Sequence, residues 1–226
     1  MFHKPIVMLD FETTGLSPAM GDRITEVAAL RIVGGQITER YVSLVNCNAR
    51  IPSFITQLTG ITQAMVDAAP PVERIVPELL AFIGGDTLAA HNASFDEKFL
   101  VAEAERIGYR CGHVGLVCSL KLSRRIFPGM GSYKLGMLSN QLGIAFRSAA
   151  HRAEADAEVA AEVLLHAARH LDLRYGLGAV EPHLLVSVNK LAAAKVPAYL
   201  DKYVQERRMA AAAADTAALT QVRAPA

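Results

Sequence analysis

The hydrophobic pattern of the chain begins with an uninterrupted apolar run over residues 6–9, which is typical of a buried strand. Asp10 and Glu12 follow where the pattern turns polar. Side chains two positions apart in a strand point to the same side. The sequence therefore predicts two carboxylates on one face at the end of this strand. A tight turn over residues 13–15 would come next, with amides and hydroxyls able to meet a phosphate or a sugar.

An antiparallel hairpin is predicted directly after this turn. Residues 24–33 and 36–45 are two extended runs joined by the pair Gly34 and Gly35. With the first strand they would form a meander of three strands. Glu26 lies inside the meander and allows two interpretations, a third catalytic acid or a solvated or locally paired strand residue. The second interpretation is favoured.

Helical spacing dominates the middle of the chain. Apolar residues recur at helical spacing over residues 72–83, a glycine pair ends that helix, and residues 87–90 form a short buried strand. A helix then begins near Ser94, a further strand-like run covers residues 114–120, and a long alanine-rich helix begins at Ala153. This succession predicts an α/β fold with a mixed sheet covered by helices.

A turn-rich break over residues 176–182 separates this region from the C-terminal part of the chain. Beyond it, residues 184–200 and 203–208 are predicted to be helical. The extension is expected to pack on the domain before it, and a dimer contact or a docked partner are the alternatives. The predicted organisation is a domain over residues 1–172, a helical extension over 173–209 and a flexible tail over 210–226.

Composition and charge narrow the class of protein. With 226 residues, 52% of them hydrophobic and 20% charged, the chain is long enough for one substantial core and is typical of a soluble globular protein. The formal net charge of +1 gives no global attraction for a polyanion, so such a site would have to be built locally. The three cysteines lack metal-ligand spacing, and no apolar run reaches membrane-spanning length. We expect free thiols, a cytoplasmic location and no membrane partner.

Three further residues carry candidate chemistry. Asp96 falls in the first turn of a predicted helix, where the helix dipole alone would explain it. The strand before that helix would nevertheless bring Asp96 to the sheet edge that carries the first two carboxylates. His151 and Asp156 are five residues apart, roughly 140° around a helix and too far to share one site on it. We therefore expect His151 in the loop before the long helix, as a mobile base, and Asp156 in its opening turns.

Three ordered motifs contain these candidates. They are DFETTG at residues 10–15, HNASFD at 91–96 and HRAEAD at 151–156. In this order and separation they resemble the DEDDh (DnaQ-like) family of 3′→5′ exonucleases, which includes polymerase proofreading subunits. The resemblance covers about residues 5–170 and is strongest to the bacterial DNA polymerase III epsilon type, through the segments LTGIT at 58–62 and SRRIFPG at 123–129.

The resemblance implies a ribonuclease H-like fold, a five-stranded mixed sheet flanked by helices, here with a helical C-terminal extension. It also implies two divalent cations, Mg²⁺ or Mn²⁺. Asp10, Glu12 and Asp156 would bind the first ion, Asp10 would bridge to the second, and Asp96 would support the second through water. Four carboxylates at one place repel one another unless cations neutralise them, and oxygen-only ligands favour Mg²⁺ or Mn²⁺ over zinc. His151 would accept a proton from the attacking water.

The implied substrate is a single-stranded or frayed 3′ end, from which nucleoside 5′-monophosphates are released with little sequence preference. DNA is favoured over RNA, with proofreading or repair as the expected role and a DNA polymerase subunit as a further candidate partner. An exoribonuclease is the alternative, because no residue that senses a 2′ hydroxyl is identified, and a catalytically silent polymerase-docking module is another. The oligomeric state stays open. By resemblance, the terminal nucleotide would contact Thr13, Thr14, Gly15, Leu16, Ile61, Asn92 and Phe95.

Overall fold

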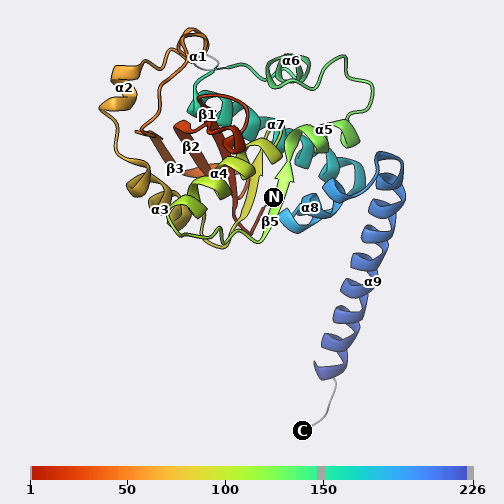
Figure 1. Cartoon of the computed structure of the whole chain (residues 1–226). Coiled ribbons are helices and arrows are strands. Elements are labelled where there is room, and N and C mark those ends of the chain that lie inside the picture. The colour runs from red at the N-terminus through yellow and green to blue at the C-terminus, as the bar shows by residue number, and fades with distance from the viewer. Residues whose placement is uncertain (1, 147–150, 223–226) are drawn as a thin grey trace.

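A five-stranded mixed sheet forms the centre of the computed structural model, which describes residues 2–146 and 151–222. The strand order is β3-β2-β1-β4-β5 (Figure 1). The first three strands form an antiparallel meander, and β4 and β5 run parallel to β1. The expected mixed sheet and the hairpin after the first strand are thereby confirmed. The strands are β1 (Ile6–Thr13), β2 (Ile24–Val33), β3 (Gln36–Leu44), β4 (Thr87–Ala90) and β5 (Gly115–Cys118).

Helices cover both faces of this sheet, because side chains alternate along each strand between two cores. Ile6 and Met8 of β1 lie in one buried cluster with α7 and α8, whereas Val7 and Leu9 lie in another with α3 and α4. The helices are η1 (Pro18–Met20), α1 (Ser53–Thr59), α2 (Gln63–Asp67), α3 (Val72–Ile83), α4 (Ser94–Arg106), α5 (Ser119–Ile126), α6 (Leu135–Gln141), α7 (Ala153–Tyr175), α8 (Pro182–Lys190), η2 (Ala193–Lys195) and α9 (Val196–Val222).

Helix α7 packs against the centre of the sheet through small side chains. Ala153, Ala157, Ala160 and Ala161 are all fully buried in the same cluster as β1 and β2. Alanine has the highest helix propensity and no side-chain entropy to lose, and its size lets the helix backbone approach the strands closely. The helix ends at Gly176, whose φ of 60° is left-handed and whose amide donates to the carbonyl oxygen of Asp172.

The C-terminal part of the chain is attached to the sheet at its β5 edge. Asn189 of α8 accepts a hydrogen bond from the Cys118 amide through Oδ1 at 2.8 Å. Leu184, Leu185 and Val188 are buried in the cluster that contains α7 and the sheet. Helix α8 therefore shares the core of the preceding domain, in the arrangement that the sequence favours. The division at residue 172 into domain and extension stays a prediction.

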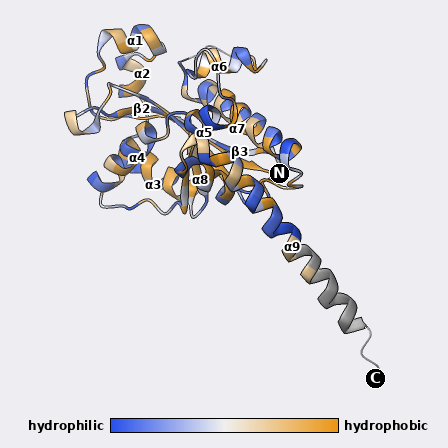
Figure 2. Cartoon of the chain, turned by 90° about the vertical axis from the view of Figure 1, so that its right-hand side faces the viewer, coloured by the Kyte–Doolittle hydropathy of each residue, from blue (hydrophilic) through white to orange (hydrophobic). Residues whose placement is uncertain are grey.

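The helices of this C-terminal part differ from those expected. The sequence predicts one helix over residues 184–200, but α8 ends at Lys190 and α9 begins at Val196. Pro197 explains the break, because proline lacks an amide proton and clashes with the carbonyl four residues earlier inside a helix, whereas it fits the first turn. Helix α9 leaves the core through a mostly hydrophilic stretch over residues 201–208 (Figure 2). It continues as helix to Val222, within the region 210–226 that the sequence predicts to be a flexible tail, and residues 223–226 of that prediction lie outside the described residues.

Two remaining expectations concern thiols and membranes. Cys47, Cys111 and Cys118 are all free, as expected. Every helix within residues 2–146 and 151–222 is too short or too polar to cross a lipid bilayer.

Shortening a buried side chain of α8 tests whether this helix belongs to the cooperative core. Leu185 is fully buried, so Leu185→Ala should lower the free energy of unfolding by about 2–5 kcal/mol, through lost apolar burial and the cavity left behind. Leu173→Ala is the matched control, because Leu173 is 87% exposed. Urea unfolding followed by circular dichroism measures both. An unchanged midpoint, or a separate early transition, would contradict a shared core.

Candidate functional site

Strand β1 carries Asp10 and Glu12 to one face of the sheet at its C-terminal end. Both are half-buried, while Phe11 between them is buried in the core under α3 and α4. Because Asp10 and Glu12 continue the positions of Ile6 and Met8, they lie on the face that α7 covers. The alternation of the strand alone places both carboxylates toward this helix.

A third carboxylate arrives from the first turn of α7. Asp156 is half-buried, and its amide donates to the carbonyl oxygen of Arg152 at 3.0 Å. One carboxylate oxygen from each of Asp10, Glu12 and Asp156 lies within 4.8 Å of the others. Sequence segments almost 150 residues apart are thus brought together at one edge of the sheet.

Asp96 lies beside this group without joining it. It is 3% exposed in the first turn of α4, and its Oδ1 accepts a hydrogen bond from the amide of Phe11 at 3.2 Å. This bond attaches α4 to β1 between Asp10 and Glu12. The charge of Asp96 is close enough to raise the pKa of Asp10.

Burial raises the pKa values of all four carboxyl groups, and repulsion by neighbouring carboxylates adds to this for Asp10, Glu12 and Asp96. Burial raises the pKa of Asp10 well above its usual range, and Asp96 and Asp156 add to this effect. Burial, followed by Asp156, raises the pKa of Glu12 to about 7, and burial raises the pKa of Asp96 to about 8. Burial also raises the pKa of Asp156. Oxygen donors whose ionised forms are this unfavourable without a counter-charge fit a hard divalent cation.

His151 stands at the entrance of α7, exposed to solvent. Its backbone is left-handed with φ of 63°, and its amide donates to Oδ2 of Asp156 at 3.3 Å. A non-glycine residue in this conformation is uncommon and costs about 1–3 kcal/mol, so surrounding contacts must hold it. The sequence places His151 before the helix and Asp156 in its opening turn, and the structure has this arrangement.

The comparisons with known proteins agree with this geometry. The family model described as exonuclease matches residues 7–164. The DNA polymerase III subunit epsilon of Aquifex aeolicus (strain VF5) is 34% identical over 172 residues, which cover 76% of this chain and 84% of that protein. The chain belongs to the DnaQ-like 3′→5′ exonuclease family.

Other proteins similar to this exonuclease are matched over very different shares of their own length. The 3′-5′ exonuclease DinG of Bacillus subtilis (strain 168) is 40% identical over 165 residues, which cover 73% of this chain but only 18% of DinG. Among solved structures, exonuclease X in complex with 5′ overhanging duplex DNA matches with a TM-score of 0.63 and 25% identity, over 81% of this chain and 99% of that one. These matches, with the sheet order, confirm the ribonuclease H-like fold.

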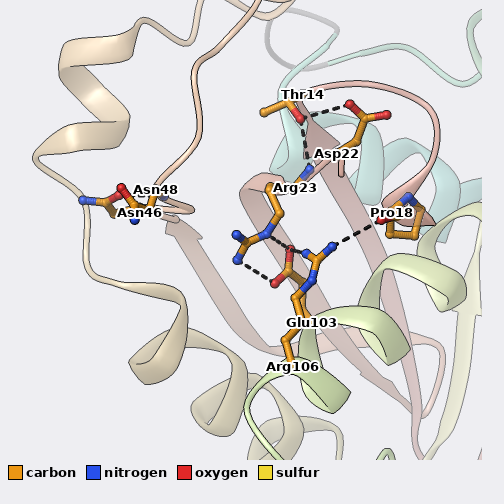
Figure 3. Close-up of polar contacts among 8 residues, drawn as sticks. All are labelled: Thr14, Pro18, Asp22, Arg23, Asn46, Asn48, Glu103 and Arg106. Atoms are coloured by element: carbon orange, nitrogen blue, oxygen red, sulfur yellow. Dashed lines mark hydrogen bonds and ion pairs between the residues drawn. The ribbon is translucent and has the colours of Figure 1, made fainter. Parts of the chain in front are cut away.

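The turn after β1 is held in the exonuclease by a network of charges around one buried glutamate (Figure 3). Glu103 of α4 is fully buried and accepts hydrogen bonds from Nε and a terminal nitrogen of Arg23 at 2.7 and 2.9 Å. Arg106 donates to Glu103 at 3.1 Å and to the carbonyl oxygen of Pro18 at 3.2 Å. Asp22 accepts from the amide of Ser17 at 2.9 Å. Residues 14–23 are therefore fixed to α4.

The substrate-contact residues expected from the sequence divide into accessible and inaccessible ones. Leu16 is 79% exposed and Asn92 is exposed, whereas Ile61 is fully buried in a small cluster with α1 and α2. The structure gives the Ile61 side chain no free surface for a base, because apolar neighbours cover it. Phe95 is half-buried against Phe99, with ring centroids 5.0 Å apart.

The threonine hydroxyls of the turn also serve the protein itself. Thr13 is 6% exposed and donates through Oγ1 to the carbonyl oxygen of Gly15 at 2.6 Å. Thr14 is 5% exposed and its Oγ1 bonds to Asp22 at 3.4 Å and accepts from the Arg23 amide at 3.0 Å. These hydroxyls shape the turn, and the side chain of Leu16 directly after it is exposed.

Sequence reasoning missed two buried glutamates. It favoured a solvated or locally paired role for Glu26, but Glu26 is 3% exposed and pairs with Arg152, 126 residues away. It assigned nothing to Glu103. A signal for Glu26 was available in the sequence, because a charged residue within an apolar strand indicates a buried and paired side chain. Glu26 is indeed flanked by buried positions in β2.

The raised carboxyl pKa values predict how the stability of the metal-free protein depends on pH. A carboxyl whose pKa is higher in the folded than in the unfolded chain stabilises the fold at low pH and loses this contribution as pH rises through the folded pKa. For Glu12 and Asp96 the window runs from ordinary values of 4.5 and 3.8 to about 7 and about 8. The free energy of unfolding in EDTA, measured by urea titration, should therefore fall from about pH 5 to about pH 8.

Added divalent cations and a matched variant serve as controls for the pH dependence of the free energy of unfolding. Mg²⁺ or Mn²⁺ should stabilise the protein most at the high end of the pH range, where the carboxylates are ionised and free to bind. Asp96→Asn should flatten the slope in EDTA, while Asp201→Ala at an exposed position of α9 should leave it unchanged. Stability in EDTA that is independent of pH would contradict the electrostatic argument.

Proposed function

We propose that this exonuclease removes nucleotides from single-stranded or frayed DNA 3′ ends and releases nucleoside 5′-monophosphates. The observation that carries the proposal is the group formed by Asp10, Glu12 and Asp156, whose carboxylate oxygens lie within 4.8 Å of one another. Membership of the 3′→5′ exonuclease family supports the polarity of the reaction. The resemblance to exonuclease X, solved with overhanging duplex DNA, supports DNA as the substrate.

The carboxylates fit two divalent cations, with Mg²⁺ or Mn²⁺ preferred by their oxygen donors. Asp10, Glu12 and Asp156 would hold the first ion, Asp10 would share the second, and Asp96 would support the second through water. When bound, the cations supply positive charge that polarises the scissile phosphate and a water molecule. Asp96 keeps one carboxylate oxygen engaged with the Phe11 amide, so its position follows that of β1.

His151 is the proposed general base. Its backbone is fixed beside Asp156 through the 3.3 Å hydrogen bond from its amide, while its side chain stays exposed. A neutral imidazole nitrogen can accept a proton from water. The water would then attack the terminal phosphorus in line, and the 3′ oxygen of the neighbouring nucleotide would leave.

The exposed apolar side chain of Leu16 is the proposed contact for the terminal bases, with Asn92 and Phe95 beside the strand end. Apolar and aromatic contacts with the faces of bases discriminate little between sequences. Thr13, Thr14 and Gly15 hold the turn that presents Leu16. A proofreading or repair role, with a DNA polymerase subunit as partner, is supported by the similarity to an epsilon subunit.

Hydrolysis of labelled oligonucleotides tests the proposal. Matched DNA and RNA strands, single-stranded or with a mismatched 3′ end, are incubated with Mg²⁺, Mn²⁺ or EDTA, and mononucleotides are quantified. We expect 5′-monophosphates from the DNA 3′ end with a cation and none in EDTA. Asp10→Ala should reduce the rate by at least about 10³-fold, since it removes a ligand shared by both ions. Asp201→Ala, exposed on α9, is the control.

The outcomes of this assay separate the candidate functions. Faster release from RNA than from DNA would replace DNA with RNA as the substrate. Equal rates for Asp10→Ala and the wild type would contradict the assignment of the site. No metal-dependent release from either polymer would leave a docking module as the better description.

Leu16→Ala tests the binding surface separately from the chemistry. The KM for single-stranded DNA should rise about tenfold, because a base contact contributes about 1–3 kcal/mol, while kcat changes little. Leu173→Ala removes a side chain of similar exposure, 87% against 79%, from α7. Steady-state kinetics should show no change for this control. A fall in kcat at unchanged KM for Leu16→Ala would argue against a role in binding.

A further inference from the structure

Glu26 receives an unusual number of hydrogen bonds for a strand residue outside the metal set. Nε of Arg152 donates to its two carboxylate oxygens at 3.2 and 3.1 Å, and a terminal nitrogen of Arg152 donates at 2.5 Å. The amide of Ala153 donates to Oε2 at 2.9 Å. With a side chain 4% exposed, this carboxylate is already saturated by donors. It therefore has no free oxygen that favours a role as a further catalytic acid.

The hydrogen-bond partners of Glu26, Arg152 and Ala153, lie at the N-terminus of α7. Arg152 is the N-cap residue of that helix and makes no side-chain cap of its own. The carboxylate of Glu26 supplies the missing acceptor from β2, and negative charge at a helix N-terminus is also favoured by the helix dipole. Glu26 lies directly opposite Glu12 in the register of β1 and β2. One side chain thus connects the strand beside the carboxylates to the helix that carries Asp156.

His151 directly precedes Arg152 and adopts a left-handed backbone. The backbone amide of His151 is held by its hydrogen bond to the carboxylate of Asp156, and the next residue, Arg152, is held by the hydrogen bonds of its guanidinium to Glu26. A strained conformation persists only where surrounding contacts over-determine it. Among the residues that the structure describes, these contacts come from Asp156 in the first turn of α7 and from Glu26 of β2.

We propose that Glu26 and Arg152 are positioning residues for the general base. Their paired side chains fix the N-terminus of α7, so that the backbone of His151 is held beside Asp156, which belongs to the carboxylate group with Asp10 and Glu12. The proposal rests on the proposed function, since His151 acts there as the base. It assigns Glu26 an effect on the chemical step and none on binding of the nucleic acid.

Steady-state kinetics of Glu26→Gln, Arg152→Lys and the double variant test the ion pair between Glu26 and Arg152, which we call the clamp. Glu26→Gln keeps the shape but loses an acceptor for the guanidinium, and Arg152→Lys keeps the charge but loses the two-pronged donor. Each should lower kcat about 10²-fold, the loss expected for a misplaced catalytic group, with KM within about threefold of the wild type. The double variant should lose no more than either single one, because both remove the same interaction.

Hydrogen exchange provides a readout that does not depend on activity or on metal. In the metal-free protein, the amide of Ala153 should exchange slowly in the wild type and at least about tenfold faster in Glu26→Gln. Asp86→Asn is the matched control, because Asp86 pairs with Arg31, which is in β2 like Glu26. Arg31 lies five residues, or roughly 16 Å, along the strand from Glu26. This control should change neither kcat nor exchange at Ala153.

The outcomes distinguish the clamp from a general loss of stability and from metal binding. Wild-type kcat in Glu26→Gln, or an equal loss in Asp86→Asn, would overturn the clamp. So would a loss of activity that excess Mn²⁺ restores, since that indicates a metal ligand. If the wild type hydrolyses no nucleic acid, the proposed function fails, and unchanged exchange at Ala153 would then overturn the clamp independently.

Discussion

Repulsion among half-buried carboxylates is the constraint on which the rest of this structure depends. Oxygens of Asp10, Glu12 and Asp156 lie within 4.8 Å of one another, where each ionised pair costs roughly 3 kcal/mol or more at an effective dielectric constant near 20. A chain free to rearrange would separate them. They stay together because two are part of a central strand and the third is in the first turn of a helix packed against that strand. The sheet and α7 form the rigid frame that a cation site needs.

Two buried glutamates, Glu26 and Glu103, lie outside the carboxylate group and hold the segments on either side of it in place. Glu26 binds Arg152 at the entrance of α7, and Glu103 binds Arg23 and Arg106 behind the turn that presents Leu16. A buried ion pair adds little net stability, because desolvation offsets the attraction, but it does penalise arrangements in which either partner is left alone. These pairs therefore define geometry more than they stabilise the fold. One restricts the segment with the proposed base, and the other restricts the turn with the surface proposed for the terminal nucleotide.

Local patterns in the sequence predict which face a side chain occupies, and this was enough for the strands, Asp10, Glu12, Asp156 and the position of His151. Local patterns do not predict which side chains pair across long sequence separations. The bonds of Glu26 and of Glu103 span 126 and 80 residues, and no periodicity specifies which arginine each receives. Burial of Ile61 depends likewise on packing of α1 and α2. The break before α9 was readable from Pro197, since proline inside a predicted helix contradicts the helical pattern.

The register of β1 and β2 explains why the arginine is needed at all. It places Glu26 directly opposite Glu12, and like charges at such positions destabilise a sheet. Glu26 raises the pKa of Glu12, whereas Arg152 lowers it. The guanidinium thus offsets, at the same place, the repulsion that the register imposes. Because Arg152 follows His151 in the chain, the arginine that offsets this repulsion is also the residue proposed to position His151. On the proposal above, one ion pair would provide both the electrostatic compensation and the positioning of the base.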